Sequence, residues 1–89
     1  MQVKPIIFLL LFCYAVPVFA QSDRADELYR NALLLKKDNK CNEAIGLLKN
    51  AIEVKPSFPE ALYELGWCYN EIQQFTLAMP ILAKARQLL

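Results

Sequence analysis

The feature that constrains this chain most is the run from residue 42 to residue 61, NEAIGLLKNAIEVKPSFPEA. Its apolar residues recur at steps of three and four, which predicts a helix with one buried face. They are Ala44, Ile45, Leu48, Ala51 and Ile52. Pro56 ends this helix, and a second run of the same kind opens at Pro59. A helix, a proline stop and a new helix start favour a repeat unit over a closed globule.

The same periodicity extends over most of the chain. It predicts helices over residues 25–37, 41–54, 59–72 and 75–88, joined by short polar connections. Pro59 stands at a first helical position, where proline is tolerated. Pro80 falls within the first turns of the last helix, where we expect at most a slight bend. The predicted fold class is therefore all-α.

A shift of the chain along itself by about 34 residues places Leu28 on Leu62 and Leu48 on Leu82. At this offset small residues fall where helices must cross closely, and large residues fill the space around the crossings. In the first unit these residues are Leu28, Ala32, Leu35, Ala44, Leu48, Ala51 and Pro56. In the second unit they are Leu62, Leu65, Gly66, Tyr69, Ala78, Leu82 and Ala85.

With these residues at this spacing, the chain resembles the tetratricopeptide repeat (TPR) family over nearly two units. The resemblance implies a right-handed helical-repeat array of four antiparallel helices, with units over residues 25–58 and 59–89. Asn31 departs from the family pattern, because a large apolar residue usually stands there. Either no preceding helix covers this position, or the first helix packs loosely.

The first twenty residues have the layout of a secretory signal peptide. Lys4 precedes an apolar run over residues 6–16, and Pro17 ends the run. Val18 and Ala20 are tolerable side chains three residues and one residue before a cut that would leave Gln21 as the new N-terminus. The run is shorter than the roughly 20 residues that a membrane span needs, and an uncleaved anchor is the alternative. We therefore expect a signal helix over residues 1–20, a short lead-in over 21–24, and an exported protein of a bacterial periplasm or envelope.

Charge and cysteine content narrow the classes of partner. The chain has ten basic and nine acidic residues, and removal of Lys4 with the signal peptide would bring the net charge to zero. A chain without excess positive charge is not expected to bind the phosphates of nucleic acid. Cys41 and Cys68 are too few for a metal site. They are either small semi-buried apolar residues or, in an oxidising compartment, a disulfide.

Catalytic chemistry finds little support in the sequence. There is no histidine, which excludes histidine-based triads and imidazole acid–base catalysis. The two glycines lie inside predicted helices, so they form no phosphate-binding loop. Glu60, Glu64 and Glu71 share part of one helical face, which indicates a solvated surface more simply than a catalytic site. We expect no enzymatic activity and no cofactor.

The resemblance implies a function in binding proteins. In TPR proteins the first helix of each unit lines a concave groove that receives a peptide or a partner helix. The corresponding residues here are Asp26, Tyr29, Leu33, Lys36, Lys37, Glu60, Tyr63, Trp67, Asn70 and Glu71. Tyr63 and Trp67, one helical turn apart, are either interface anchors or packing residues against a neighbouring helix. Lysines in the first unit and glutamates in the second predict a partner with acidic and then basic residues.

The last predicted helix, residues 75–88, is apolar nearly all round, and such a helix expects burial on more than one side. Repeat arrays usually end in a polar capping helix and need about three units for stability. Three hypotheses follow: an exported protein-binding scaffold, the leading segment of a larger exported sensor or enzyme, or a structural repeat that self-associates through residues 75–89.

Overall fold

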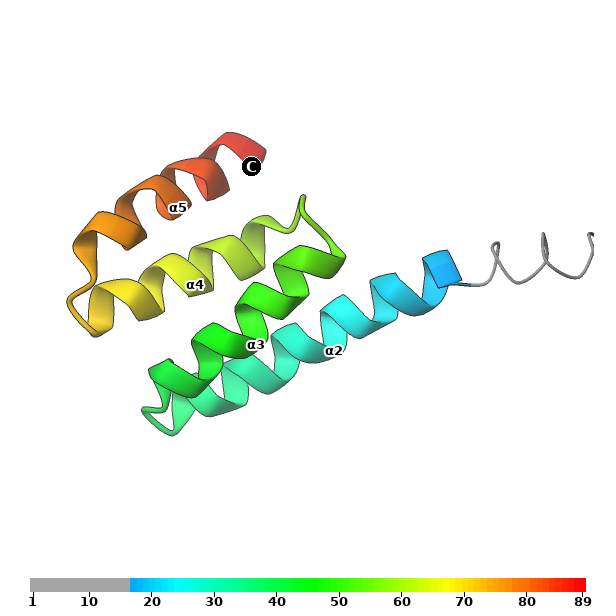
Figure 1. Ribbon diagram of the computed structural model, residues 1–89, viewed down its shortest axis with the longest axis horizontal. Helices are drawn as coiled ribbons and strands as arrows, with labels where there is room; N and C mark the ends of the chain where they lie inside the picture. Colours follow the sequence, from blue (N-terminus) through cyan, green and yellow to red (C-terminus); the bar gives the residue numbers. More distant parts are fainter. Residues whose placement is uncertain (1–16) are drawn as a thin grey trace, which may run out of the picture.

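The structure is a computed structural model that describes residues 17–89, with their side chains from residue 23. Its four helices are α2 (Pro17–Lys37), α3 (Cys41–Val54), α4 (Pro59–Glu71) and α5 (Phe75–Leu88). Each helix packs against the next and runs in the opposite direction (Figure 1). The all-α prediction, with four antiparallel helices in a repeat array, is confirmed.

The first described helix begins earlier than the sequence analysis predicts, at Pro17 instead of residue 25. Proline is favoured at a first helical position because its missing N–H has no partner there, and no helix breaker follows before residue 25. The predicted lead-in over residues 21–24 is therefore helical, and the predicted cut after Ala20 falls inside α2. The rest of the predicted signal peptide, residues 1–16, lies outside the described residues. No helix in the part of the chain that the structure describes has both the length and the apolar character to cross a membrane.

The turn inside each unit repeats one backbone geometry. Asn39 and Gln73, which are equivalent at the repeat offset, have positive φ angles of 61° and 65°. In both turns the following amide donates a hydrogen bond back to a carbonyl of the last helical turn: Lys40 to Leu35 at 2.9 Å, and Gln74 to Tyr69 at 2.8 Å. This is the Schellman arrangement that ends a helix with one left-handed residue. The two units therefore share their turn as well as their helices.

The core consists mainly of small residues at the helix crossings. The alanines buried there are Ala25, Ala32, Ala44, Ala51, Ala61, Ala78 and Ala85. The larger buried residues are Leu48, Phe58, Leu62, Leu65 and Cys68. Gly66 permits the closest approach, because a Cβ added there would lie 2.6 Å from the Cγ and Cδ2 of Leu82.

The other residues of the predicted packing pattern lie nearer the surface. Leu28, Leu35 and Tyr69 are half-buried against the core, Leu82 is half-buried, and Pro56 is exposed in the α3–α4 connection. Asn31 is exposed as well, since no helix among the described ones covers that side of α2.

Candidate functional site

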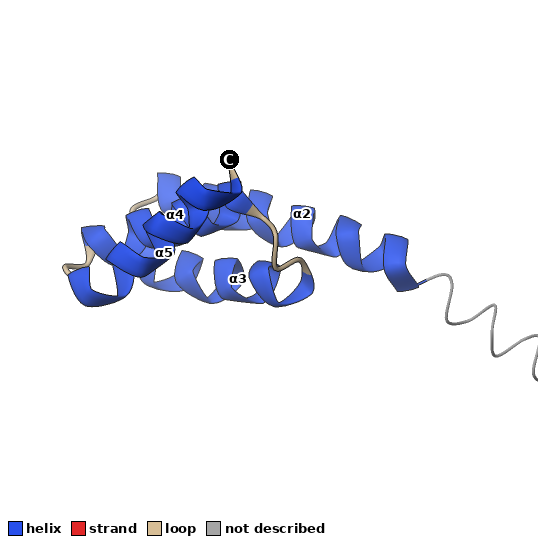
Figure 2. Ribbon diagram, turned by 90° about the horizontal axis from the view of Figure 1, so that it is seen from above, coloured by secondary structure: helices blue, strands red, loops and turns tan. Residues whose placement is uncertain are grey.

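The first helices of the two units, α2 and α4, lie on one side of the array, and α3, which contacts both, lies on the other side, below them in Figure 2. Because α2 and α4 touch each other only lightly, side chains from both helices are available along their shared side. We call this side the α2–α4 face and define it by Tyr29, Lys36, Glu60, Tyr63, Glu64 and Trp67.

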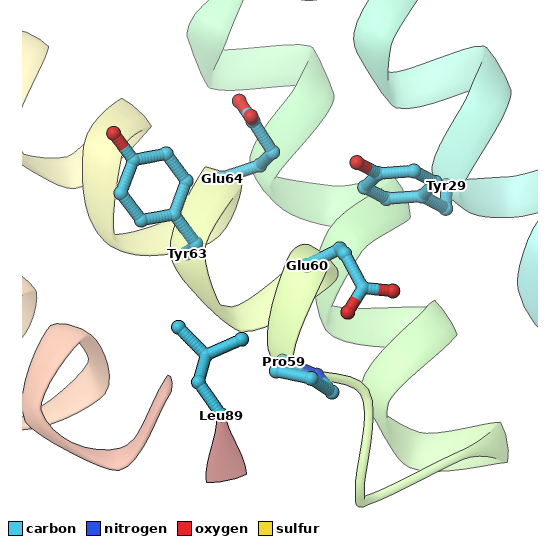
Figure 3. A pocket seen from close by; sticks show the side chains of 6 residues that line it. All are labelled: Tyr29, Pro59, Glu60, Tyr63, Glu64 and Leu89. Atoms are coloured by element: carbon cyan, nitrogen blue, oxygen red, sulfur yellow. The ribbon is translucent and has the colours of Figure 1, made fainter. Parts of the chain in front are cut away.

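A cavity of about 200 Å³ opens on the α2–α4 face. Its lining comes from both helices and from the end of the chain: Tyr29, Pro59, Glu60, Tyr63, Glu64 and Leu89 (Figure 3). Figure 3 shows the two glutamates between the two tyrosine rings. Three of the residues expected to form the groove, Tyr29, Glu60 and Tyr63, therefore come together at one opening.

The ring of Tyr29 packs against the ring of Phe58. The ring centroids of Tyr29 and Phe58 lie 5.1 Å apart at an interplanar angle of 46°. Phe58 is only 3% exposed, and the Nζ of Lys55 lies 4.5 Å from its ring centroid. Phe58 falls in the connection predicted between residues 54 and 59, so this packing role was not predicted from the sequence. An aromatic residue directly before the proline that opens a helix was the signal available.

Lys36 joins the two helices of the face. Its ammonium forms an ion pair with Glu64 and lies 4.1 Å above the centroid of the Trp67 ring. The side chains of Lys36 and Glu64 are 25% and 14% exposed, so both are well sheltered. The interpretation of Glu64 as part of a solvated surface is therefore wrong. Glu64 also compensates the charge of Lys36. Lys36 therefore no longer counts among the first-unit lysines expected to attract acidic residues of a partner.

The two aromatic residues of α4 have different environments. Tyr63 is 52% exposed and borders the cavity. Trp67 is half-buried, packs against the core and carries Lys36 over its ring. The sequence left open whether these residues are interface anchors or packing residues. Tyr63 suits an interface anchor, whereas Trp67 packs against the core and contacts α2.

The electrostatic balance at the cavity is negative. Burial raises the pKa of the Tyr29 hydroxyl, and the nearby charges of Glu64 and Glu60 raise it further against the opposing effect of Lys36. Burial on its own would lower the pKa of Lys36, but the hydrogen bond and the attraction to Glu64 outweigh it and raise that pKa. Since Lys36 compensates Glu64, the remaining negative charge beside the tyrosines is that of Glu60.

The remaining residues of the predicted groove lie away from this cavity. Leu33, Lys36 and Lys37 line a second cavity of about 380 Å³ on α2, together with Leu34. Asp26 is half-buried on α2, whereas Asn70 and Glu71 are exposed at the C-terminal end of α4. The predicted groove is thus divided, and of its residues only Tyr29, Glu60 and Tyr63 line the site shown in Figure 3.

Cys41 and Cys68 lie at the interface of α3 and α4, and both are free thiols in this structure. Burial raises the pKa of Cys68 to about 12, with hydrogen bonding and charge interaction from Cys41 acting in the same direction. The two sulfurs therefore interact, and a disulfide between them stays a prediction. Within the described residues, no group of three or more cysteine and acidic side chains is placed to hold a metal ion.

Comparison with known proteins gives a likeness to solved structures. No protein-family model and no curated protein matches the chain. Among solved structures, MamA MSR-1 C2 superposes with a TM-score of 0.69 at 22% sequence identity, over 98% of this chain and 49% of that one. This chain spans about half the length of MamA, a protein of TPR type. At this identity the likeness shows the fold alone, a helical-repeat array.

Proposed function

We propose that this protein is an exported scaffold that binds a peptide or a helix of a partner protein on the α2–α4 face. The observation that carries the proposal is the cavity between Tyr29 and Tyr63, since it joins the two repeat units and offers a half-exposed aromatic side chain. Tyrosine is a favoured anchor at interfaces because it combines a large apolar ring with a polar end.

Selection from a random peptide library displayed on phage, with the full chain as bait, tests this proposal. We expect selected peptides whose affinity falls by about tenfold in a Tyr63→Ala variant, measured by calorimetry. Phe75→Ala is the matched control, because Phe75 is 53% exposed against 52% for Tyr63 and lies on α5. Absence of selected peptides, or equal losses in the two variants, would contradict binding on this face.

Export is the second part of the proposal and is supported by the sequence of residues 1–20 alone. Expression of the full chain in a bacterium, followed by fractionation and N-terminal sequencing, tests it. We expect a periplasmic product that begins at Gln21. A product that begins at Met1 and stays in the cytoplasm would show that residues 1–20 do not act as a cleaved signal.

Self-association through α5 is a second candidate function, favoured by the apolar side chains that α5 exposes. Phe75, Leu77 and Met79 are 53%, 46% and 72% exposed. The outer side of α2 offers exposed Glu27 and Asn31 instead, so a head-to-tail stack would place polar groups on the apolar α5 surface. Two copies would therefore pair α5 with α5 in an isologous contact.

The mass from light scattering over a concentration series tests self-association. We expect the mass to rise toward that of a dimer, and a Met79→Arg variant to remain monomeric. Leu34→Arg is the matched control, since Leu34 is 62% exposed and lies on α2. A monomer at every concentration would refute this second candidate and leave peptide binding unaffected.

A further inference from the structure

The cavity on the α2–α4 face combines the two features that recognise a cationic side chain, namely aromatic rings and carboxylates. Tyr29 and Tyr63 contribute rings and hydroxyl groups, and Glu60 and Glu64 lie between them (Figure 3). A cation over a tyrosine ring is attracted by the quadrupole of the ring, and a carboxylate beside it adds a charge-assisted hydrogen bond. Both interactions favour a positively charged ligand.

The size of the cavity suits a side chain. Its volume is about 200 Å³, while an apolar cavity of about 150 Å³ holds a benzene molecule. A guanidinium or ammonium group with part of its aliphatic stem therefore fits. Pro59 and Leu89 supply apolar lining against which such a stem can lie.

The charges of the cavity are not balanced from within. Lys36–Glu64 is the only ion pair among the residues whose side chains are described, so Glu60 keeps both carboxylate oxygens for a ligand. An acidic ligand would be repelled by Glu60, whose charge no lysine among these residues compensates as Lys36 does that of Glu64. A neutral apolar group would remove water from Glu60 without replacing its hydrogen bonds, which is costly.

Elsewhere in the described chain a lysine ammonium lies over an aromatic ring at two places. Lys36 lies over Trp67 at 4.1 Å, with Glu64 as its ion-pair partner, and Lys55 lies over Phe58 at 4.5 Å. The Lys36–Glu64–Trp67 group joins a cation, a carboxylate and an aromatic ring directly beside the cavity. In the cavity Glu60 stands beside the tyrosine rings in a similar combination, and it has no ion-pair partner among the residues whose side chains are described.

We infer that the Tyr29–Glu60–Tyr63–Glu64 cavity receives a lysine or arginine side chain of the bound partner. The cationic group bonds to the carboxylate of Glu60, its charge faces the tyrosine rings, and its stem lies along Pro59 and Leu89. This inference rests on the proposed function, because it names the chemistry of the peptide that the face binds. It replaces the acidic-then-basic pattern expected from the sequence with a requirement for a basic residue.

The peptide selection described above tests the inference when the sequences are counted. Peptides selected on the full chain should be enriched in lysine and arginine relative to the starting library. Selection on a Glu60→Gln variant should lose this enrichment, and the affinity of a selected peptide should fall by about fivefold, as for a partly exposed charge pair. Replacement of the basic residue of that peptide by glutamine should weaken its binding to the original chain by a similar factor.

Glu71→Gln is the matched control, because it removes one exposed carboxylate from the same helix outside the cavity. It should leave both the enrichment and the affinity unchanged. Peptides that require Tyr63 but show no basic enrichment would overturn this inference alone. Equal effects of Glu60→Gln and Glu71→Gln would also overturn it, since the attraction would then come from overall charge. Failure to select any peptide would overturn the proposed function itself.

Discussion

The second helices of the two units, α3 and α5, match in sequence position and differ in environment. Cys41 and Ile45 of α3 are half-buried and pack against the core. At the repeat offset they correspond to Phe75 and Met79 of α5, which are 53% and 72% exposed. Equivalent apolar positions are therefore covered in one unit and open in the other.

The difference arises from the neighbouring helix. α4 packs on the outer side of α3, whereas none of the described helices packs on the outer side of α5. Both helices bury their small residues on the inner side, at Ala44 and Ala78 in corresponding positions. An apolar side chain in this fold is thus buried or exposed according to what lies next to its helix, as the one-dimensional character of repeat proteins implies.

The largest effect is expected when the equivalent leucines of α3 and α5 are each replaced by alanine. Leu48 is 1% exposed between α2 and α4, and Leu48→Ala should lower the free energy of unfolding by about 3 kcal/mol. Leu82 is half-buried, and Leu82→Ala should cost about 1 kcal/mol. Urea denaturation followed by circular dichroism measures both. Equal losses would show that α5 is covered as well as α3 in solution.

High pH should weaken the covered α3–α4 interface in particular. Burial raises the pKa of Cys68 from its ordinary value of 9.0 to about 12, so the unfolded chain releases this proton first as the pH rises. The folded state therefore loses stability above pH 9, by about 1–2 kcal/mol at pH 10.5. Denaturation midpoints at pH 8 and pH 10.5, with reductant present, measure the loss.

A Cys68→Ala variant is the control for this alkaline effect. It should retain only the smaller loss due to Tyr29 and Lys36, whose pKa values are raised by burial and by the neighbouring Glu64 respectively. Because both of these groups also hold their protons more tightly in the folded state, they act in the same direction. An unchanged alkaline loss in Cys68→Ala would rule out Cys68 as its source.

The smallest effect on stability is expected at the crossing of α4 and α5, where Gly66 approaches Leu82. Gly66→Ala would place a Cβ at 2.6 Å from Leu82, and the displacement should outweigh the higher helix propensity of alanine, for a net cost of about 1 kcal/mol. Gly46→Ala on α3 meets no atom within 4 Å and should stabilise by about 0.5–1 kcal/mol. Thermal melts of both variants provide the measurement. Stabilisation by Gly66→Ala would mean that α4 and α5 approach less closely.

Most of the fold was predictable from the sequence because it depends on local periodicity. The spacing of Leu48 and Ala51, the proline stops and the repeat offset together predict three of the four helices to within a residue. The start of α2 differs from the predicted one, because residues 17–24 were assigned to the signal helix and the lead-in, whereas the described helix begins at Pro17, a favourable first helical residue. The signal peptide itself stays a prediction.

The candidate site was predictable only in part because its contacts cross between helices. Periodicity places Tyr29 and Tyr63 on first helices but does not show which charges meet between them. The ion pair of Lys36 with Glu64, and the support of Tyr29 by Phe58, join residues far apart in the sequence. Such pairings depend on how the helices and their connections pack together, which no pattern within a single helix contains.

The sequential packing of the four described helices also bears on how the chain folds. Nearly all contacts join successive helices, and only the light contact between α2 and α4 skips one. Low contact order of this kind favours rapid folding, because few long loops have to close before native contacts form. The ion pair of Lys36 with Glu64 is a long-range contact between α2 and α4, and we expect it to form after the helical hairpins. A peptide bound across the same two helices would add a second such closure and couple the folding of one unit to that of the other.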